Sequence, residues 1–284
     1  MEPKIIIHGG FFSESGTNQE VKKAKQQALS EIVKAAHNYL LNHPAVETAA
    51  YAVSLLEDCD LFNAGLGSQI QADGKIRMSA SIMDGTSKKF AGVINVEDVK
   101  NPVFIAKKLM DFPDSVLCGR EALDFARQQG FEYYNPVTKQ RREEYEKKRE
   151  QQSRLGTVGC VALDSEGNLA AATSTGGKGF EIPGRVSDSA TVAGNFANEY
   201  AAISCTGVGE DIVSAGLAAK IVTRVTDGFS LMDASQKSFE ELKPFDGFAG
   251  VIGITVDGHI HYQNSHPYMV WASFDQGLKV FSGE

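Results

Sequence analysis

Thr157, in the run Leu155-Gly156-Thr157-Val158-Gly159, is the residue of this chain best placed to become a nucleophile. The hydroxyl of an internal threonine attacks poorly because it has no base of its own. If the Gly156–Thr157 bond were cut, Thr157 would also carry a free α-amine, which titrates near pH ~8 and can act as that base. A threonine activated by its own N-terminal amine is an established arrangement for acyl transfer. The same run also suits the start of a buried strand, and the sequence leaves that alternative open.

Two charged residues further along could hold an amino-acid substrate. Arg185 and Asp188 lie three positions apart in the segment PGRVSDS. The guanidinium of Arg185 can bind a carboxylate with two hydrogen bonds, and Asp188 can pair with an α-ammonium. Both substrate groups are costly to bury unless they are paired. The alternative is an ion pair between the two residues at the surface, which would contribute little to the stability of the fold.

The segment SCTGVGE could stabilise a developing oxyanion. The Thr206 side chain and the N–H of Gly207 stand just before a predicted helix. Donors at such a turn can point at the oxygen on which charge develops in acyl transfer. The alternative is a simple turn that leads into the helix.

The composition of the 284-residue chain argues against several classes of function. Its net charge of −8 disfavours nucleic-acid binding, which needs a basic face. No apolar run approaches the ~20 residues that cross a bilayer, and the first residues are too soon polar for a signal peptide. The cysteines lack metal-ligand spacing and are expected to be reduced thiols: Cys59, Cys118, Cys160 and Cys205. We therefore expect a cytoplasmic protein that binds neither nucleic acid nor a membrane.

The order of the expected elements favours antiparallel sheets covered by helices over a doubly wound parallel sheet. A strand is expected at 4–8, hairpins at 157–173 and 251–263, and helices at 18–41, 46–58, 210–226 and 231–242, with two more starting near 101 and 119. Helical spacing predicts which face each of the first two helices buries. These faces carry Val21, Ala24, Ala28, Ile32, Ala36 and Tyr39 in the first, and Ala49, Ala50, Val53 and Leu56 in the second.

The segment 139–154 differs from the rest of the chain. It is dense in charges of both signs and has no aliphatic residue, so we expect that it cannot bury a face. It is either a solvated helix or a mobile linker directly before Gly156 and Thr157. With either interpretation a charged linker at 135–155 marks a boundary between two segments.

A phosphate-binding loop is another interpretation of the glycine-rich segments. Lys178 follows two glycines, but Gly179 stands where such a loop needs Ser or Thr, and no glycine has the required offset before the lysine. None of the segments gives G-x-G-x-x-G between a strand and a helix. The sequence therefore disfavours nucleotide binding.

Seven short motifs occur in order along nearly the whole chain. They are HGG at 8–10, FNAGLGS at 62–68, IMDG at 82–85, GTVG at 156–159, ATSTGG at 172–177, PGRVSDS at 183–189 and CTGVGE at 205–210. With them the chain resembles the plant-type L-asparaginase/isoaspartyl peptidase family of N-terminal-nucleophile hydrolases. The resemblance implies an α+β fold, a four-layer αββα sandwich, that cuts itself before Thr157. It also implies an α subunit of 1–156 and a β subunit of 157–284, together one structural domain, in a homodimer of αβ units.

The resemblance assigns catalytic roles to individual residues. Thr157 would be the nucleophile of both self-cleavage and turnover, with Thr175 beside it to hold its hydroxyl. Asn63 would form a hydrogen bond near the reacting centre. Thr206 and Gly207 would form the oxyanion site.

The resemblance also implies binding sites. Arg185 and Asp188 would bind the α-carboxylate and α-amine of the substrate, with Val208 and Gly209 close to the substrate backbone. No organic cofactor is expected. A structural sodium ion is implied on main-chain carbonyls of the loop at Leu56, Glu57, Cys59, Phe62, Ala64 and Leu66.

The chain departs from the family pattern at three places. Phe11 and Phe12 follow the HGG motif where many members have small residues, Val208 replaces a threonine, and the segment 264–269 is bulkier than usual. These changes spare the matched catalytic positions but leave the substrate preference open among asparagine, β-aspartyl dipeptides and glycosylated asparagine. His8 is interpreted as structural.

The expected function is that of a self-processed threonine amidohydrolase. It would cleave β-aspartyl (isoaspartyl) dipeptides and L-asparagine, both small molecules, and release L-aspartate. One alternative is an uncleaved relative that acts as a binding protein. The other is a threonine endopeptidase that acts on protein partners, against which Arg185 and Asp188 argue because they suit a free amino-acid end.

Overall fold

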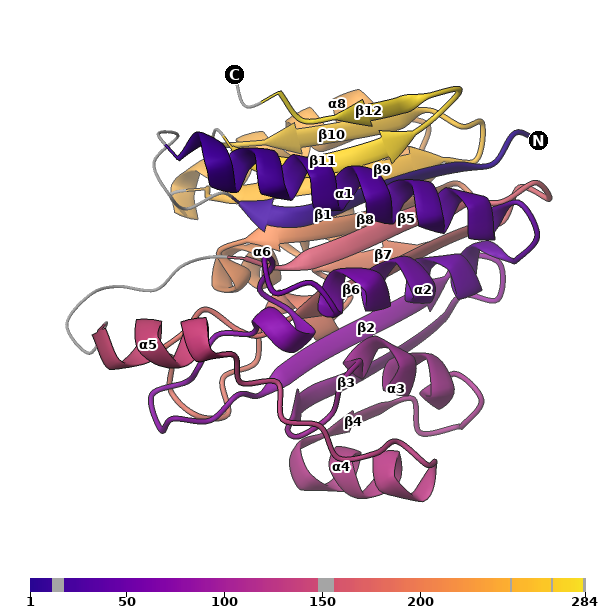
Figure 1. The fold of residues 1–284 in the computed structure, drawn as a ribbon. Helices are drawn as coiled ribbons and strands as arrows, with labels where there is room; N and C mark the ends of the chain where they lie inside the picture. Colours follow the sequence, from indigo (N-terminus) through magenta and orange to yellow (C-terminus); the bar gives the residue numbers. More distant parts are fainter. Residues whose placement is uncertain (12–17, 148–155, 246, 267, 283–284) are drawn as a thin grey trace.

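Two β-sheets and the helices packed on them make up this α+β protein (Figure 1). The computed structural model describes residues 1–11, 18–147, 156–245, 247–266 and 268–282. Phe12 and the 148–155 part of the charged linker therefore lie outside the described residues. Within the described chain no helix is both long and apolar enough to cross a bilayer.

The larger sheet has eight strands in the described chain, in the order β12-β11-β1-β5-β6-β2-β3-β4. Neighbouring strands are antiparallel except for β3 and β4, which confirms the expected antiparallel architecture. Strands from before and after residue 157 interleave along it, because β1 lies between β11 and β5, and β6 lies beside β2. The bounds are β1 (Lys4–Phe11), β2 (Met78–Asp84), β3 (Lys89–Val96), β4 (Val116–Cys118), β5 (Val158–Leu163), β6 (Leu169–Thr175), β11 (Met269–Phe274) and β12 (Leu278–Val280).

The smaller sheet has the order β10-β9-β8-β7 and is antiparallel throughout. Its strands β8 and β9 contact β5 and β6 of the larger sheet, and an apolar cluster fills the space between the two sheets. The two expected hairpins are confirmed as β5–β6 and β9–β10. The bounds are β7 (Asn195–Ala197), β8 (Ala201–Gly207), β9 (Ala249–Thr255) and β10 (Ile260–Asn264).

Helices from both parts of the chain pack on the sheets. Helices α1, α2 and α3 contact the larger sheet, while α7 and α8 contact the smaller one. The bounds are α1 (Gln19–Leu40), α2 (Ala45–Glu57), α3 (Pro102–Leu109), α4 (Gly119–Gln128), α5 (Lys139–Lys147), α6 (Gly209–Ala215), α7 (Leu217–Thr226) and α8 (Leu231–Glu240), with short 3-10 turns at Gly65–Gly67, Asp188–Ala190 and Lys243–Phe245.

The buried face of helix α1 agrees with the expected one only in part. Ala36 is fully buried as expected, and so are Leu29, Val33 and Leu40, whereas Ala28 and Ile32 are only half-buried. Both stripes have helical spacing, and the buried one includes two leucines and a valine that remove more apolar surface from water. The expected face of α2 is confirmed, since Ala49, Ala50, Val53 and Leu56 are all buried.

One further expectation was wrong. The single helix expected at 210–226 is divided into α6 and α7 by Gly216, whose φ of 59° is left-handed and ends the first helix. The described part of the charged segment forms α5, which agrees with the solvated-helix alternative except that Arg141 is buried, at 8% exposed. The Arg141 Nε donates to the carbonyl of Gly67 at 2.8 Å, and the Tyr145 ring stacks on Phe180.

Candidate active site

Thr157 lies at the entrance of β5, where the antiparallel ladder brings it opposite the end of β6. Val158 pairs with Ser174, so residue 157 stands next to Thr175 although 18 positions separate them in sequence. The Thr157 Oγ1 donates to the Thr175 Oγ1 at 3.3 Å, and Thr157 is 6% exposed. The buried-strand alternative and the nucleophile prediction are therefore compatible, because the strand begins one residue after the hydroxyl.

The carbonyl of Gly156 receives two hydrogen bonds. Asn63 Nδ2 donates to it at 2.8 Å and Thr175 Oγ1 donates at 3.2 Å. Asn63 is held in turn by the N–H of Gln69, which donates to its Oδ1 at 2.9 Å. Negative charge that develops on the Gly156 oxygen would therefore meet two donors already in position.

Gly10 lies against the Gly156–Thr157 peptide, a contact that sequence reasoning missed. Its φ is 82°, and an added Cβ would stand 2.9 Å from the Thr157 nitrogen. Only a residue without a side chain lets the end of β1 approach this peptide so closely. The signal in the sequence was the pair of glycines that ends a β-branched strand.

Several of the predicted site residues share one small pocket. Thr157, Thr175, Arg185, Asp188, Gly207 and Gly209 all line it, together with Gly156, Gly177, Lys178 and Ser187. Asn63 lies behind the pocket at the Gly156 carbonyl. Thr206 and Val208 are not among the lining residues, and the Val208 N–H donates to the carbonyl of Phe248.

Asp188 is a buried carboxylate without a cation paired to it among the described residues. It is 2% exposed, and its Oδ2 has no hydrogen-bond partner in the described chain. Burial raises the pKa of Asp188 to about 7, against the opposing charge of Arg185. Leaving such a group unpaired is costly, so the pocket favours a ligand that brings an ammonium group.

Arg185 does not pair with Asp188 as the surface alternative supposed. Its Nε and Nη2 donate to the two carboxylate oxygens of Glu210, at 2.7 and 2.8 Å. These hydrogen bonds lower the pKa of Glu210 to about 2. Gly209 lies between the two substrate-binding candidates, since a Cβ there would stand 2.8 Å from Asp188 Oδ1 and 2.9 Å from Arg185 Nη2. Glu210 is thus a second residue that sequence reasoning missed.

The turn at Gly207 is shaped by tight backbone packing. Its φ is 143°, and an added Cβ would lie 2.3 Å from the carbonyl oxygen of Phe248. The Thr206 Oγ1 is buried without a hydrogen-bond partner in the described chain. The Phe248 ring contacts Phe11 on one side and His266 on the other. Two of the departures noted in the sequence therefore meet behind this turn.

Comparison with known proteins agrees with this site. A family model described as Asparaginase matches residues 1–280. The chain belongs to this family. Its members include the isoaspartyl peptidase/L-asparaginase of Nostoc sp., which is 43% identical over 99% of this chain and 94% of its own length.

Two other members of the asparaginase family match at similar length. The isoaspartyl peptidase/L-asparaginase of Synechocystis sp. is 41% identical over 99% of this chain and 90% of its own. The isoaspartyl peptidase of Escherichia coli is 36% identical over 94% of this chain and 92% of its own. The expected family is therefore confirmed.

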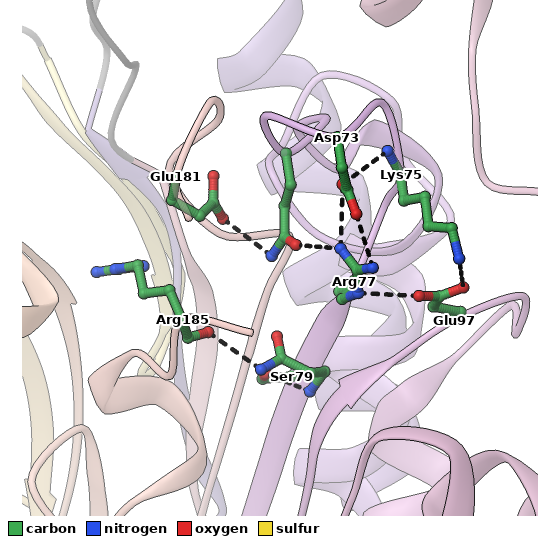
Figure 2. Close-up of polar contacts among 9 residues, drawn as sticks. Asp73, Lys75, Arg77, Ser79, Glu97, Glu181 and Arg185 are labelled. Atoms are coloured by element: carbon green, nitrogen blue, oxygen red, sulfur yellow. Dashed lines mark hydrogen bonds and ion pairs between the residues drawn. The ribbon is translucent and has the colours of Figure 1, made fainter. Parts of the chain in front are cut away.

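In this asparaginase-family chain, residues from before position 157 hold the loop that carries Arg185 (Figure 2). Asn95 Nδ2 donates to the main-chain carbonyl of Arg185 at 3.2 Å, and Gln71 Nε2 donates to Glu181 at 3.4 Å. Arg77 in turn binds Gln71 through its Nη1 at 2.6 Å. Figure 2 shows the Arg185 guanidinium turned away from these contacts, so they hold its backbone while its side chain binds Glu210 at the wall of the pocket.

His8 connects the two sheets beneath the pocket. Its Nε2 lies 3.0 Å from the Ser204 Oγ, which lies 2.7 Å from the Thr173 Oγ1. Burial lowers the pKa of His8 to about 3, so the ring is neutral at working pH. This geometry agrees with the structural interpretation of His8.

The six residues of the expected sodium site extend from the last turn of α2 to the 3-10 turn at 65–67. Glycines let main-chain carbonyls crowd together there, since a Cβ on Gly65 would stand 2.2 Å from the Glu57 oxygen and one on Gly67 would stand 1.9 Å from the Phe62 oxygen. The carbonyls of Leu56, Cys59 and Ala64 accept hydrogen bonds within the loop.

Proposed function

We propose that this chain is a threonine amidohydrolase that cuts itself before Thr157 and then releases L-aspartate from isoaspartyl dipeptides and L-asparagine. The observation that carries the proposal is the shared pocket of the Thr157 hydroxyl, Arg185 and Asp188. The printed names of the relatives, isoaspartyl peptidase and L-asparaginase, describe hydrolysis of the same amide class.

Self-cleavage begins with attack of the Thr157 Oγ1 on the Gly156 carbonyl carbon. The charge on the carbonyl oxygen is stabilised by Asn63 and Thr175, which already donate to it. The C–N bond breaks as the nitrogen takes up a proton, so the acyl chain passes from nitrogen to oxygen. Water hydrolyses the resulting ester and leaves Thr157 with a free α-amine. This step divides the chain into subunits of 1–156 and 157–284.

Turnover uses the same hydroxyl on the side-chain amide of the substrate. Arg185 binds the α-carboxylate and Asp188 binds the α-ammonium, which fixes the amide carbon beside Thr157. The free α-amine accepts the hydroxyl proton and passes it to the departing nitrogen. Gly207, which lines the pocket, would supply a main-chain oxyanion donor, with Thr206 directly before it in the chain. Water then hydrolyses the acyl-enzyme.

The assembly and surroundings proposed for this enzyme follow from the same resemblance. The helix–sheet and sheet–sheet contacts support a four-layer αββα sandwich as one structural domain, and we propose a homodimer of αβ units. All four cysteines are free thiols, which supports a cytoplasmic enzyme.

A sodium ion fits the donors of the loop after α2. Main-chain carbonyl oxygens suit a hard cation, and glycines at 65 and 67 make room for their close approach. Glu57, Phe62 and Leu66 would hold the ion together with Leu56, Cys59 and Ala64. Bound there, it would fix the loop that leads into Asn63. No organic cofactor takes part in the proposed reaction.

Substitution of the nucleophile tests the proposal. The purified wild-type protein is expected to run as two fragments on a denaturing gel and to release aspartate from β-aspartyl dipeptides. Thr157→Ala is expected to stay a single chain and to release none, because the attacking hydroxyl is gone. Thr86→Ala removes an exposed hydroxyl and serves as the control.

Other outcomes would contradict the proposal in distinct ways. Processing of Thr157→Ala would show that another residue is the nucleophile. A wild-type chain of uncut mass without activity would favour the binding protein. Hydrolysis of longer peptides in preference to β-aspartyl dipeptides would favour the endopeptidase.

A further inference from the structure

Lys178 stands on the border between two pockets. It lines the small pocket that contains Thr157 and Arg185. It also lines a larger, open pocket, whose walls include the apolar side chains of Phe180 and Ile182. A substrate that extends out of the inner pocket along this side would pass the lysine.

The ammonium of Lys178 is available to a ligand. Its side chain is 36% exposed, and its Nζ lies 3.4 Å from Glu210 Oε1. The Glu210 carboxylate already accepts two shorter hydrogen bonds from Arg185, so its negative charge is largely neutralised without Lys178. The other acids nearby are Asp188 and Glu181, and Glu181 accepts the main-chain N–H of Lys178.

We propose that Lys178 binds the α-carboxylate of the amino acid that leaves from an isoaspartyl dipeptide, which makes it a residue that determines substrate preference. The inference rests on the proposed function. Such a dipeptide has two free carboxylates, of which Arg185 holds the one on the aspartyl half. The second lies two bonds beyond the scissile nitrogen. Asparagine releases ammonia and offers no second carboxylate, so Lys178 favours dipeptides over asparagine.

The chemistry of lysine suits a leaving group. Its ammonium is a point charge on a flexible stem, whereas an arginine fork would fix the carboxylate in a rigid two-point contact. The leaving amino acid must depart before water reaches the acyl-enzyme. A lysine contact with its carboxylate, weaker and more mobile than an arginine contact, allows that departure. The side chain of the leaving residue would pack against Phe180 and Ile182, and Glu210 at the same wall disfavours acidic leaving residues.

The test compares three substrates: β-aspartyl-leucine, its C-terminal amide and L-asparagine. In the wild-type enzyme, the KM of the amide is expected to exceed that of the free dipeptide by about tenfold, because the amide cannot form the ion pair. Lys178→Met is expected to lower the ratio of kcat/KM for β-aspartyl-leucine to that for asparagine by about tenfold, mainly through KM. Lys178→Arg should restore most of the ratio. Lys88→Met removes an exposed lysine that lines neither pocket and serves as the control.

The outcomes separate this inference from the proposed function. A wild-type enzyme that hydrolyses none of the three substrates contradicts the function itself. A wild-type enzyme that hydrolyses the dipeptide and its amide with equal KM overturns the role of Lys178 without use of any variant. The role is also overturned if Lys178→Met changes the dipeptide and the amide to the same extent. A denaturing gel of each variant checks that self-cleavage is complete.

Discussion

At the scale of single residues, Asp188 makes the pocket sensitive to pH. Burial raises its pKa from the ordinary 3.8 to about 7, so the carboxyl is neutral below about pH 7 and charged above it. Only the charged form pairs with an α-ammonium. Affinity for a ligand with that group should therefore fall as the pH drops through about 7.

Competitive inhibition can isolate this effect. Between about pH 8 and pH 6 the inhibition constant of L-aspartate is expected to rise about tenfold, as one group with a pKa near 7 gains its proton. Succinate has the same carbon chain without the amine, and its inhibition constant should fall instead, because protonation removes a repelling charge. Parallel changes for the two inhibitors would show that Asp188 does not face the ammonium.

The family resemblance predicted which residues share the pocket better than it predicted how they pair there. The motifs that carry Thr157, Arg185 and Gly207 implied one common site, and the structure brings these residues together. The partner of Arg185 could not be predicted, because side-chain direction in a loop depends on which distant element packs against it. Here Glu210, in the first turn of α6, accepts hydrogen bonds from the guanidinium of Arg185, while Asp188 is buried.

At the scale of elements, the approach of β5 to its neighbours depends on a glycine. Gly159 pairs with His8 across the ladder, and an added Cβ would lie 2.4 Å from the His8 Nε2 and 2.0 Å from the Ser204 Oγ of the other sheet. A methyl group here would push the two sheets apart at the His8–Ser204 contact.

Gly159→Ala is therefore expected to destabilise the protein by about 1–3 kcal/mol, the usual cost of overpacking a core. For a chain of this size that lowers the melting temperature by several degrees. The comparison is best made in the uncut Thr157→Ala background, where every variant is a single chain. Gly277→Ala is the matched control, since nothing lies within 4 Å of its added Cβ. Equal melting temperatures for the two variants would contradict the interpretation.

Elements with strong periodic or turn signals were predictable, and those defined by distant contacts were not. Helix α2 and both hairpins agree with their patterns because apolar spacing and tight turns act locally. The buried face of α1 was predicted only in part, because two stripes of helical spacing overlap on it. Helix α5 has no apolar stripe, and a single arginine bound to the Gly67 carbonyl and one stacked tyrosine dock it. Such contacts cannot be predicted from a charge-rich sequence.

At the scale of the whole molecule, the proposed cut falls between strands that share one sheet. The 1–156 part contributes β1, β2, β3 and β4 to the larger sheet, and the 157–284 part contributes β5, β6, β11 and β12. Their order places β1 between two strands of the second part, and β6 between β5 and β2. The two parts also meet at the Gly156 carbonyl, which lines the pocket and accepts hydrogen bonds from Asn63 of the first part and Thr175 of the second.

The two fragments should therefore remain one particle after cleavage. Separation would break the backbone ladders β1–β11, β1–β5 and β2–β6 and expose the apolar residues between the sheets, a cost of many kcal/mol. Salt screens surface ion pairs but not these contacts, so both fragments should co-elute in size-exclusion chromatography at low and at high salt. They should part only when denaturant unfolds the sheet. The uncut Thr157→Ala chain provides the reference elution volume. Separate elution of the fragments from native protein would mean that the strands do not interleave as described, and the pocket built from both parts would then be lost with the sheet.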